Sequence, residues 1–312
     1  MTSRGLGLIR HAPLVIAAAL LLTPPMMSAQ TPAFVREKQI LVTILDKSGV
    51  VVRDLSANDF VVREGDDARE VTTATPATDP MWLSLIVDTT KEARGTDATR
   101  PDLLKALTSF VSAVQSTAEG TAISLTECAG AAVTQVGFTT NTGVLRSAIQ
   151  HLAYGPQPES VLLEALVDSS KQLRRVSSPR RAIVSLDFVS SVESSSVLPE
   201  KVGEAVHGAG ASYWALSIQR SLSTHAAVGM LGVDARPPDG RNAVLDLLPD
   251  STGGQHLNVF GTSLLEPTLL KLADILTHQY LVTYISPGGK PVSSIAVSTA
   301  RGDKALVAPI VR

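Results

Sequence analysis

The sequence predicts an α/β fold: a doubly wound, mostly parallel sheet together with a small β module formed by N- and C-terminal strands. Nearly continuous apolar runs, such as residues 82–87 and 181–186, are typical of parallel strands buried on both faces. Segments with apolar residues at helical spacing lie between these runs, which indicates strands alternating with helices. Short strand-like segments at the two ends of the chain do not make a well-covered sheet alone, so we expect them to pair with each other.

The first 29 residues are predicted to be a secretory signal peptide. Arg4 and Arg10 precede an apolar run over residues 14–22 that ends at two prolines. This run is shorter than the roughly 20 apolar residues that a transmembrane helix needs. We therefore expect cleavage near Ala29 and a mature protein that is exported, periplasmic or extracellular, with no integral membrane segment.

Residues 34–78 are predicted to form the N-terminal part of the β module. Ile40, Val42 and Ile44 alternate with other residues, which is the period of a strand. Turn-forming residues separate the strand-like segments that follow. After the strand that starts near residue 39, strands are expected at 50–53, 60–63 and 69–73. A linker with two prolines at residues 75–80 marks the boundary of the module.

Residues 80–278 are predicted to form the α/β domain. Pro101 opens a helix in which apolar side chains repeat at helical spacing as far as Val114. Residues 220–241 are rich in glycine and proline and are expected to form a long surface loop. Strands are expected at 82–87, 121–125, 132–136, 181–186 and 212–218, and helices at 101–114, 141–153, 161–173, 199–207, 242–248 and 264–278.

Residues 279–312 return to strand-like patterns. Strands are expected at 279–285, 292–298 and 305–311. We expect these strands to pack with the N-terminal β module rather than with the α/β domain.

The composition excludes several classes of protein. The chain has 312 residues, of which 44% are apolar and 18% charged, and this excludes a disordered protein. Its formal net charge of -2 argues against a nucleic-acid partner, which would require a basic face. The six histidines are scattered without metal-ligand spacing, and the one cysteine, Cys128, cannot form an internal disulfide.

Oxygen-bearing side chains follow or precede three of the predicted elements. Asp88, Thr90 and Glu92 come after the strand at 82–87, Ser160 precedes the helix at 161–173, and Asp187 ends the strand that begins at 181. Ligands of open α/β sheets bind outside the carboxyl ends of the strands. Carboxylates and hydroxyls that converge there suit a hard cation such as Mg²⁺, although Ca²⁺ and Mn²⁺ are not excluded. Serine-rich residues 190–196 are expected to form a mobile loop beside this site.

This pattern resembles the von Willebrand factor type A domain. The metal-ion-dependent adhesion site of that family reads Asp-x-Ser-x-Ser, then a Thr before a Leu and an Ala, then an Asp after the central strand. Asp88 and Thr90 match the first two positions, and Ser160 matches the Thr, since residues 160–166 read Ser-Val-Leu-Leu-Glu-Ala-Leu. Asp187 matches the last Asp. Glu92 departs from the pattern at the third position, and Phe188 replaces the glycine that usually follows the last Asp.

The resemblance extends over nearly the whole mature chain. Residues 42–49, with Leu55 and Asp59-Phe60, resemble the lead-in of exported "VWFA-related" proteins that are common in acidobacterial genomes. The Thr-Gly-Gly turn at 252–254 and the segment Gln-Tyr-Leu-Val-Thr-Tyr at 279–284 match further motifs of those proteins. The order and spacing of these motifs carry the resemblance, since each motif alone is weak.

The resemblance implies metal-dependent binding of a protein partner. Whether this property transfers to the present chain depends on Glu92. This side chain either adds a third carboxylate to the ion, or points to solvent and pairs with Lys91 or Arg94. Alternatively, the site is degenerate, and Asp88 and Asp187 only bind loop amides. The sequence thus leaves two main functions open: an exported interaction module with an unidentified protein partner, or a metal-independent structural or assembly component of the cell envelope. We do not expect an enzyme, because no nucleophile, base and oxyanion donor can be placed together.

Overall fold

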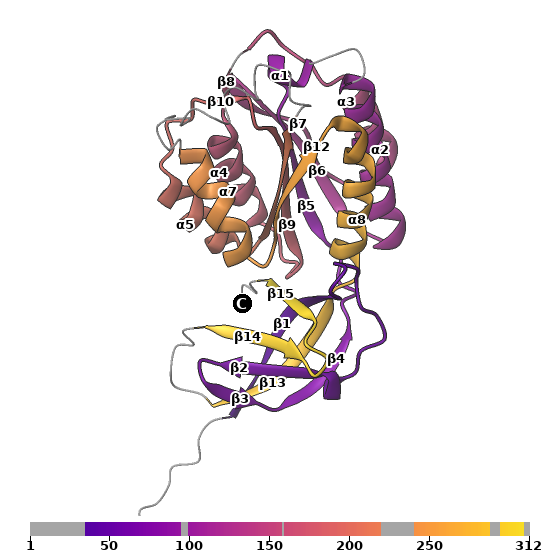
Figure 1. Cartoon of the computed structure of the whole chain (residues 1–312), viewed down its shortest axis with the longest axis vertical. Coiled ribbons are helices and arrows are strands. Elements are labelled where there is room, and N and C mark those ends of the chain that lie inside the picture. Colours follow the sequence, from indigo (N-terminus) through magenta and orange to yellow (C-terminus); the bar gives the residue numbers. More distant parts are fainter. Residues whose placement is uncertain (1–34, 95–98, 158, 220–239, 288–293, 309–312) are drawn as a thin grey trace, which may run out of the picture.

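The computed structural model describes residues 35–94, 99–157, 159–219, 240–287 and 294–308. The predicted signal peptide and residues 220–239 of the predicted surface loop lie outside these ranges. The chain forms two units, an α/β unit and a β module, which lie one above the other in Figure 1.

The α/β unit is a mostly parallel sheet, which confirms the predicted fold class. Its strand order is β10-β8-β6-β5-β9-β11-β12, with β7 paired antiparallel to β6. The chain runs from β5 to β6 on one side and later returns to β9 on the other side, so the order reverses beside β5. The strands are β5 (Trp82–Val87), β6 (Ala122–Ala129), β7 (Ala131–Thr139), β8 (Glu159–Ser160), β9 (Arg181–Phe188), β10 (Val192–Glu193), β11 (Ser212–Gln219) and β12 (His256–Phe260).

Helices cover both faces of this sheet. In Figure 1, α2, α3 and α8 lie on one side and α4, α5 and α7 on the other. Each layer has its own core, one around Phe110 and Trp214 and the other around Leu166 and Tyr213. The helices are α1 (Lys91–Arg94), α2 (Thr99–Thr117), α3 (Thr142–Gln150), α4 (Leu162–Leu173), α5 (Pro199–Ala209), α7 (Gly240–Ser251) and α8 (Leu265–Thr277), with 3-10 turns η1 (Ala57–Asp59) and η2 (Thr262–Leu264). No helix within the described ranges is long and apolar enough to span a membrane.

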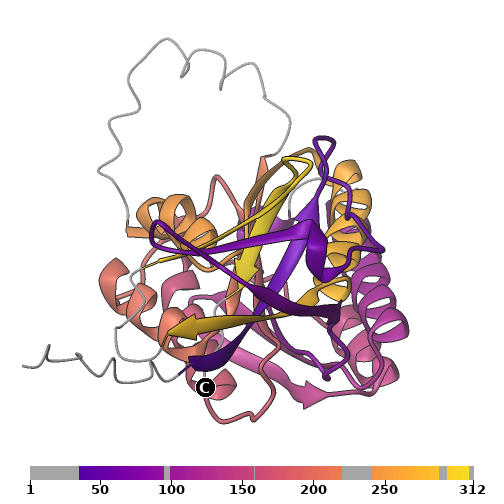
Figure 2. The ribbon, with the colours of Figure 1, turned by 90° about the horizontal axis from the view of Figure 1, so that it is seen from below.

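The β module combines strands from both ends of the chain, as Figure 2 shows from below. One sheet has the order β15-β1-β13-β4 and the other the order β14-β2-β3. Residues 50–53 do not form the predicted strand, because only one bridge, Leu45 to Val51, pairs there. The strands are β1 (Val35–Leu45), β2 (Phe60–Glu64), β3 (Asp67–Arg69), β4 (Val71–Pro76), β13 (Tyr280–Pro287), β14 (Ile295–Thr299) and β15 (Lys304–Ala308).

The two chain crossings between the units meet at Arg180. Its guanidinium donates to the carbonyl oxygens of Ala77 (3.0 Å) and Asp79 (2.8 Å) on the first crossing. It also donates to the carbonyl oxygen of Leu276 (3.2 Å) and to Oε1 of Gln279 (3.2 Å) on the second. Burial lowers the pKa of Arg180 to about 10, so the group stays charged at neutral pH.

Arg180→Ala is expected to destabilise the chain by about 3 kcal/mol, because it leaves several buried acceptors without a donor. We also expect faster proteolysis within the 77–81 crossing. Urea unfolding and limited proteolysis measure the two effects. The control is Arg174→Ala, whose side chain is exposed and makes one 3.5 Å hydrogen bond, to the carbonyl oxygen of Glu204. Equal losses in both variants would contradict a clamping role for Arg180.

Candidate functional site

Two aspartates lie side by side where the parallel strands end. Asp88 directly follows β5, and Asp187 lies near the end of β9, which pairs with β5. Both side chains are buried, at 0% and 1% exposure. This is the edge of the sheet where the strand order reverses, the place at which open α/β sheets build their sites.

Asp88 is enclosed by hydroxyl and amide donors. Its Oδ1 accepts from the amide nitrogen of Thr90 (2.8 Å), and its Oδ2 accepts from the hydroxyl of Ser191 (2.6 Å). The Ser191 hydroxyl also lies 3.0 Å from the hydroxyl of Thr90. Asp88, Thr90 and Ser191 therefore form a closed polar network, and all three are buried.

The other two predicted ligands lie at the margin of this network. Glu92 accepts a hydrogen bond from the hydroxyl of Ser190 (2.8 Å), which joins α1 to the segment after β9. The buried hydroxyl of Ser160 lies 3.6 Å from the sulfur of Cys128. The structure thus brings Asp88 and Thr90 into direct contact, whereas Glu92 and Ser160 each engage other partners.

Asp187 faces a buried guanidinium. Its Oδ2 lies 3.8 Å from Nη1 of Arg241, and its Oδ1 accepts from the hydroxyl of Ser217 (2.9 Å). Burial raises the pKa of Asp187 to about 7, although Arg241 and Ser217 oppose that rise. Arg241 is itself 3% exposed and carries the positive charge that this carboxylate needs in a low-dielectric environment.

Arg241 also holds the segment that follows β9. Its Nη1 donates to the carbonyl oxygens of Phe188 (3.3 Å) and Ser191 (2.9 Å), and its Nη2 donates to that of Val189 (3.2 Å). We call Asp88, Thr90, Asp187, Ser191 and Arg241 the acidic site. Sequence reasoning did not identify Ser191 and Arg241 as members of this site. Ser191 lies in the segment that was expected to be a loop, and Arg241 lies in the first turn of α7, 54 positions beyond Asp187.

The serine-rich segment beside the acidic site, which was expected to form a loop, contains the short strand β10. Strand β10 pairs with β8, and the amide of Ser194 donates to the carbonyl oxygen of Ser160 (2.8 Å). The half-buried carboxylate of Glu193 accepts from the amides of Leu162 (3.2 Å) and Ser195 (3.1 Å). Glu193 therefore binds the first turn of α4, where a negative charge is favourable.

The residues of the acidic site do not fit a divalent ion in this arrangement. Asp88 and Thr90, which would face the ion, share hydrogen bonds with Ser191. Arg241 already occupies the neighbourhood of Asp187, and like charges about 4 Å apart repel by about 4 kcal/mol per unit pair. Across the described ranges, no three His, Cys, Asp or Glu side chains group closely enough to hold a metal ion. The Oδ2 atom of Asp187 has no hydrogen-bond partner and lies 3.8 Å from Nη1 of Arg241, a cation that offsets part of the cost of burying this carboxylate.

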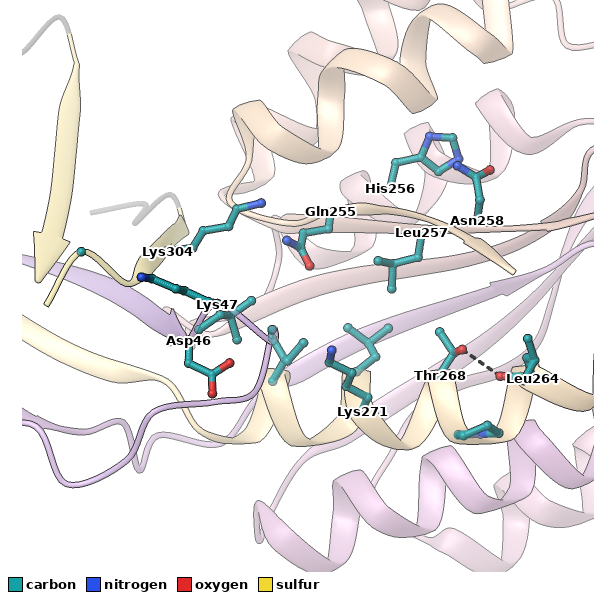
Figure 3. Close-up of a pocket in the computed structure, with 16 residues that line it drawn as sticks. Asp46, Lys47, Gln255, His256, Leu257, Asn258, Leu264, Thr268, Lys271 and Lys304 are labelled. Atoms are coloured by element: carbon teal, nitrogen blue, oxygen red, sulfur yellow. Dashed lines mark hydrogen bonds between the residues drawn. The ribbon is translucent and has the colours of Figure 1, made fainter. Parts of the chain in front are cut away.

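A cavity of about 750 Å³ lies elsewhere, between the α/β unit and the β module. Figure 3 shows Lys271 and Thr268 on helix α8 beneath it and Gln255 and Leu257 above. None of the five predicted ligands lines this cavity. The acidic site is thus a closed, buried feature, and it is separate from this opening.

No protein-family model matches the sequence, and no curated protein matches it. Solved structures do match. BatB from Bacteroides thetaiotaomicron is 11% identical with a TM-score of 0.46, and the match covers 62% of this chain and 98% of that chain. A von Willebrand factor type A protein from Catenulispora acidiphila is 10% identical with a TM-score of 0.46, over 88% of this chain and 72% of that chain.

Several of the matching structures are von Willebrand factor type A domains. The sequence resembles the same family. Proximal thread matrix protein 1 of the mussel byssus also matches, at 11% identity and a TM-score of 0.47 over 65% of this chain. This chain spans 49% of that protein's length. Similarities at this level carry no argument about function, which is inferred below from the chain's own residues.

Proposed function

We propose that this chain is an exported, non-enzymatic protein-interaction module that binds a protein partner at the carboxyl-terminal edge of the parallel sheet. One observation carries the proposal. The segment over residues 189–198, which lies against the acidic site, exposes Val189, Val192 and Leu198 at 40%, 52% and 64%. Three exposed apolar side chains within ten residues offer apolar contact area to a partner.

The contacts that hold this segment in place support the same function. The segment is held by Arg241 at its start, by the β8–β10 pairing at its middle and by the carboxylate of Glu164 at its end, which accepts from the amide of Ser196 (3.2 Å). A surface that is ordered before binding loses little conformational entropy when a partner docks. The acidic site thus acts as the support of a binding surface.

A hydrolase is the reading that this geometry favours least. The hydroxyl of Ser217 lies 2.8 Å from Nε2 of His256, and Nδ1 of His256 lies 3.8 Å from a carboxylate oxygen of Asp246. However, Ser217 is 2% exposed and donates to Asp187, so no substrate can reach its oxygen. The 3.8 Å separation is also too long for a hydrogen bond to orient the imidazole.

A specific observation favours the second candidate, a metal-independent structural or assembly component of a cell envelope. The buried guanidinium of Arg241 already supplies a positive charge beside Asp187, so contact with a partner there needs no added cation. The two candidates differ in the interaction surface: the first binds its partner at residues 189–198, whereas in the second the β module docks to other chains. Mass spectrometry of the protein from cell fractions tests export, with a mature N-terminus near residue 30 expected.

Site-specific photo-crosslinking from position 192 in the full chain tests the proposed surface. We expect a discrete partner to be captured, and we expect Val192→Asp to weaken partner affinity at least tenfold, because an unpaired charge replaces an apolar contact. Val50 provides a matched control, since it is exposed to 50% against 52% for Val192 but lies in the β module. Equal capture of the same partner from positions 192 and 50 would count against the proposed surface.

A further inference from the structure

We infer that the guanidinium of Arg241 is a built-in replacement for the divalent cation of the acidic site, so that the site works without metal. The five residues of the site supply two carboxylates and one fixed positive charge. The inference deepens the proposed function. Its consequence, which rests on that function, is that partner binding at residues 189–198 is independent of divalent cations.

The first argument is charge. Asp187 is 1% exposed, and an isolated carboxylate in that position would not stay ionised. Arg241 is the cation within reach, with Nη1 3.8 Å from Oδ2 of Asp187, and a guanidinium does not lose its proton in proteins. The guanidinium of Arg241 would repel a divalent cation placed beside it. To bind such a cation, Asp88 would also have to give up its hydrogen bond from Ser191.

The second argument is architecture. A metal ion at the end of a parallel sheet joins separate loops. Arg241 binds one of these loops, the segment after β9, and Ser191 of that segment in turn donates to Asp88. The planar fork of Arg241 reaches the carbonyl oxygens of Phe188, Val189 and Ser191 while it faces Asp187. Lysine has three donors on a single nitrogen, so it lacks the two separate, coplanar nitrogens with which Arg241 reaches these acceptors.

The third argument is position in the helix. Arg241 is the second residue of the 12-residue helix α7. A positive charge in the first turn is unfavourable for the helix itself, because the helix dipole places positive partial charge there. The tertiary contacts of Arg241 therefore outweigh a local preference, which indicates a role in the acidic site rather than in helix formation.

Calorimetric titration of Mn²⁺ into the full mature chain tests the inference. We expect no saturable binding at concentrations up to about 5 mM and no change in Tm on addition of EDTA. In Arg241→Ala, we expect a lower Tm that Mn²⁺ raises in a saturable manner, with no such effect in Arg241→Ala/Asp187→Ala. Saturable binding by the unmodified chain that Asp88→Ala abolishes would overturn the inference.

Ser191→Ala keeps the test decisive if Arg241→Ala does not fold. This variant removes the Ser191 hydroxyl from Oδ2 of Asp88, which keeps a longer 3.5 Å contact from the amide of Phe188, and it retains the guanidinium, so we still expect no binding of Mn²⁺. Binding by Ser191→Ala would show that the hydroxyl, and not Arg241, excludes the ion, and would overturn the inference.

Crosslinking from position 192 separates the two proposals. Capture that is equal with Mg²⁺ and with EDTA supports both. Capture that is lost only with EDTA overturns the inference and leaves the proposed function standing. Absence of a partner under both conditions counts against the proposed function, while the titration of the chain alone still decides the role of Arg241.

Discussion

Replacing Glu64 by alanine is expected to destabilise the β module by about 4 kcal/mol, the cost of removing one partner from a buried ion pair. The Glu64 side chain is 6% exposed and accepts from Lys38 (2.7 Å) and Arg69 (3.0 Å). It also accepts from the hydroxyls of Tyr284 (3.0 Å) and Ser286 (2.8 Å). These four donors come from β1, β3 and β13, so Glu64 joins the two sheets of the module. Urea unfolding of the variant measures the loss.

The same carboxylate makes the β module sensitive to acid. Burial alone would raise the pKa of Glu64, but the hydrogen bonds from Lys38, Ser286, Tyr284 and Arg69 outweigh burial and lower the pKa from 4.5 to about 2. A pKa that is lower in the folded state stabilises the protein above the unfolded value and loses this effect as the pH falls. We therefore expect about 3 kcal/mol of stability to disappear between about pH 5 and pH 2, and this loss to be absent in Glu64→Ala.

Asp67→Ala is the matched control for Glu64. Asp67 lies in the adjacent strand β3 and contacts the same Arg69 at 3.1 Å, but its side chain is 74% exposed. Exposed ion pairs contribute about 0–1 kcal/mol, so we expect little change in stability and an unchanged acid transition. Similar losses in the two variants would mean that burial of Glu64 does not decide its contribution.

Gly254→Ala is expected to cost more than about 3 kcal/mol, at the upper end for overpacking. A Cβ atom at this position would overlap the backbone carbonyl of Tyr213, where strand β11 begins. Backbone atoms cannot rotate away as a side chain can, so the turn after α7 would have to move. Thermal unfolding measures the effect, and hydrogen exchange of β11 amides locates it.

Gly203→Ala provides the same substitution without the overlap. Gly203 lies in helix α5, and nothing is within 4 Å of the Cβ that would be added. Alanine is a better helix former than glycine, so we expect a gain of about 0.5–1 kcal/mol. A Gly254→Ala variant as stable as the wild type would show that the turn tolerates the displacement.

Local sequence patterns were enough to predict the layers of this fold. Apolar runs such as residues 82–87 and 181–186 became β5 and β9, because a strand buried on both faces leaves a direct trace in composition. Helical spacing likewise predicted α2 and α8. Boundaries were less accurate: the helix expected at 242–248 spans Gly240–Ser251 and includes Pro249. The strand expected at 50–53 is only a bridge.

The candidate site was predictable only in part. Asp88 and Asp187 follow buried strands, and the edge at which such strands end is fixed by the parallel topology, so their proximity could be inferred. The side chains that surround Asp88 and Asp187 could not be inferred from the sequence. The contact between Ser191 and Asp88 joins residues 103 positions apart, and no spacing rule connects them.

By itself, the sequence thus determined the class of fold, the pairing of the chain ends in one module and the positions of two buried aspartates. Only the tertiary structure decided which charges those aspartates face. Glu64 receives donors from three other strands, and Asp187 receives Arg241 from a helix that begins 53 residues later. The physical reason is range: periodicity reflects contacts within a few residues, whereas the free energy of a buried charge depends on neighbours that only folding brings together.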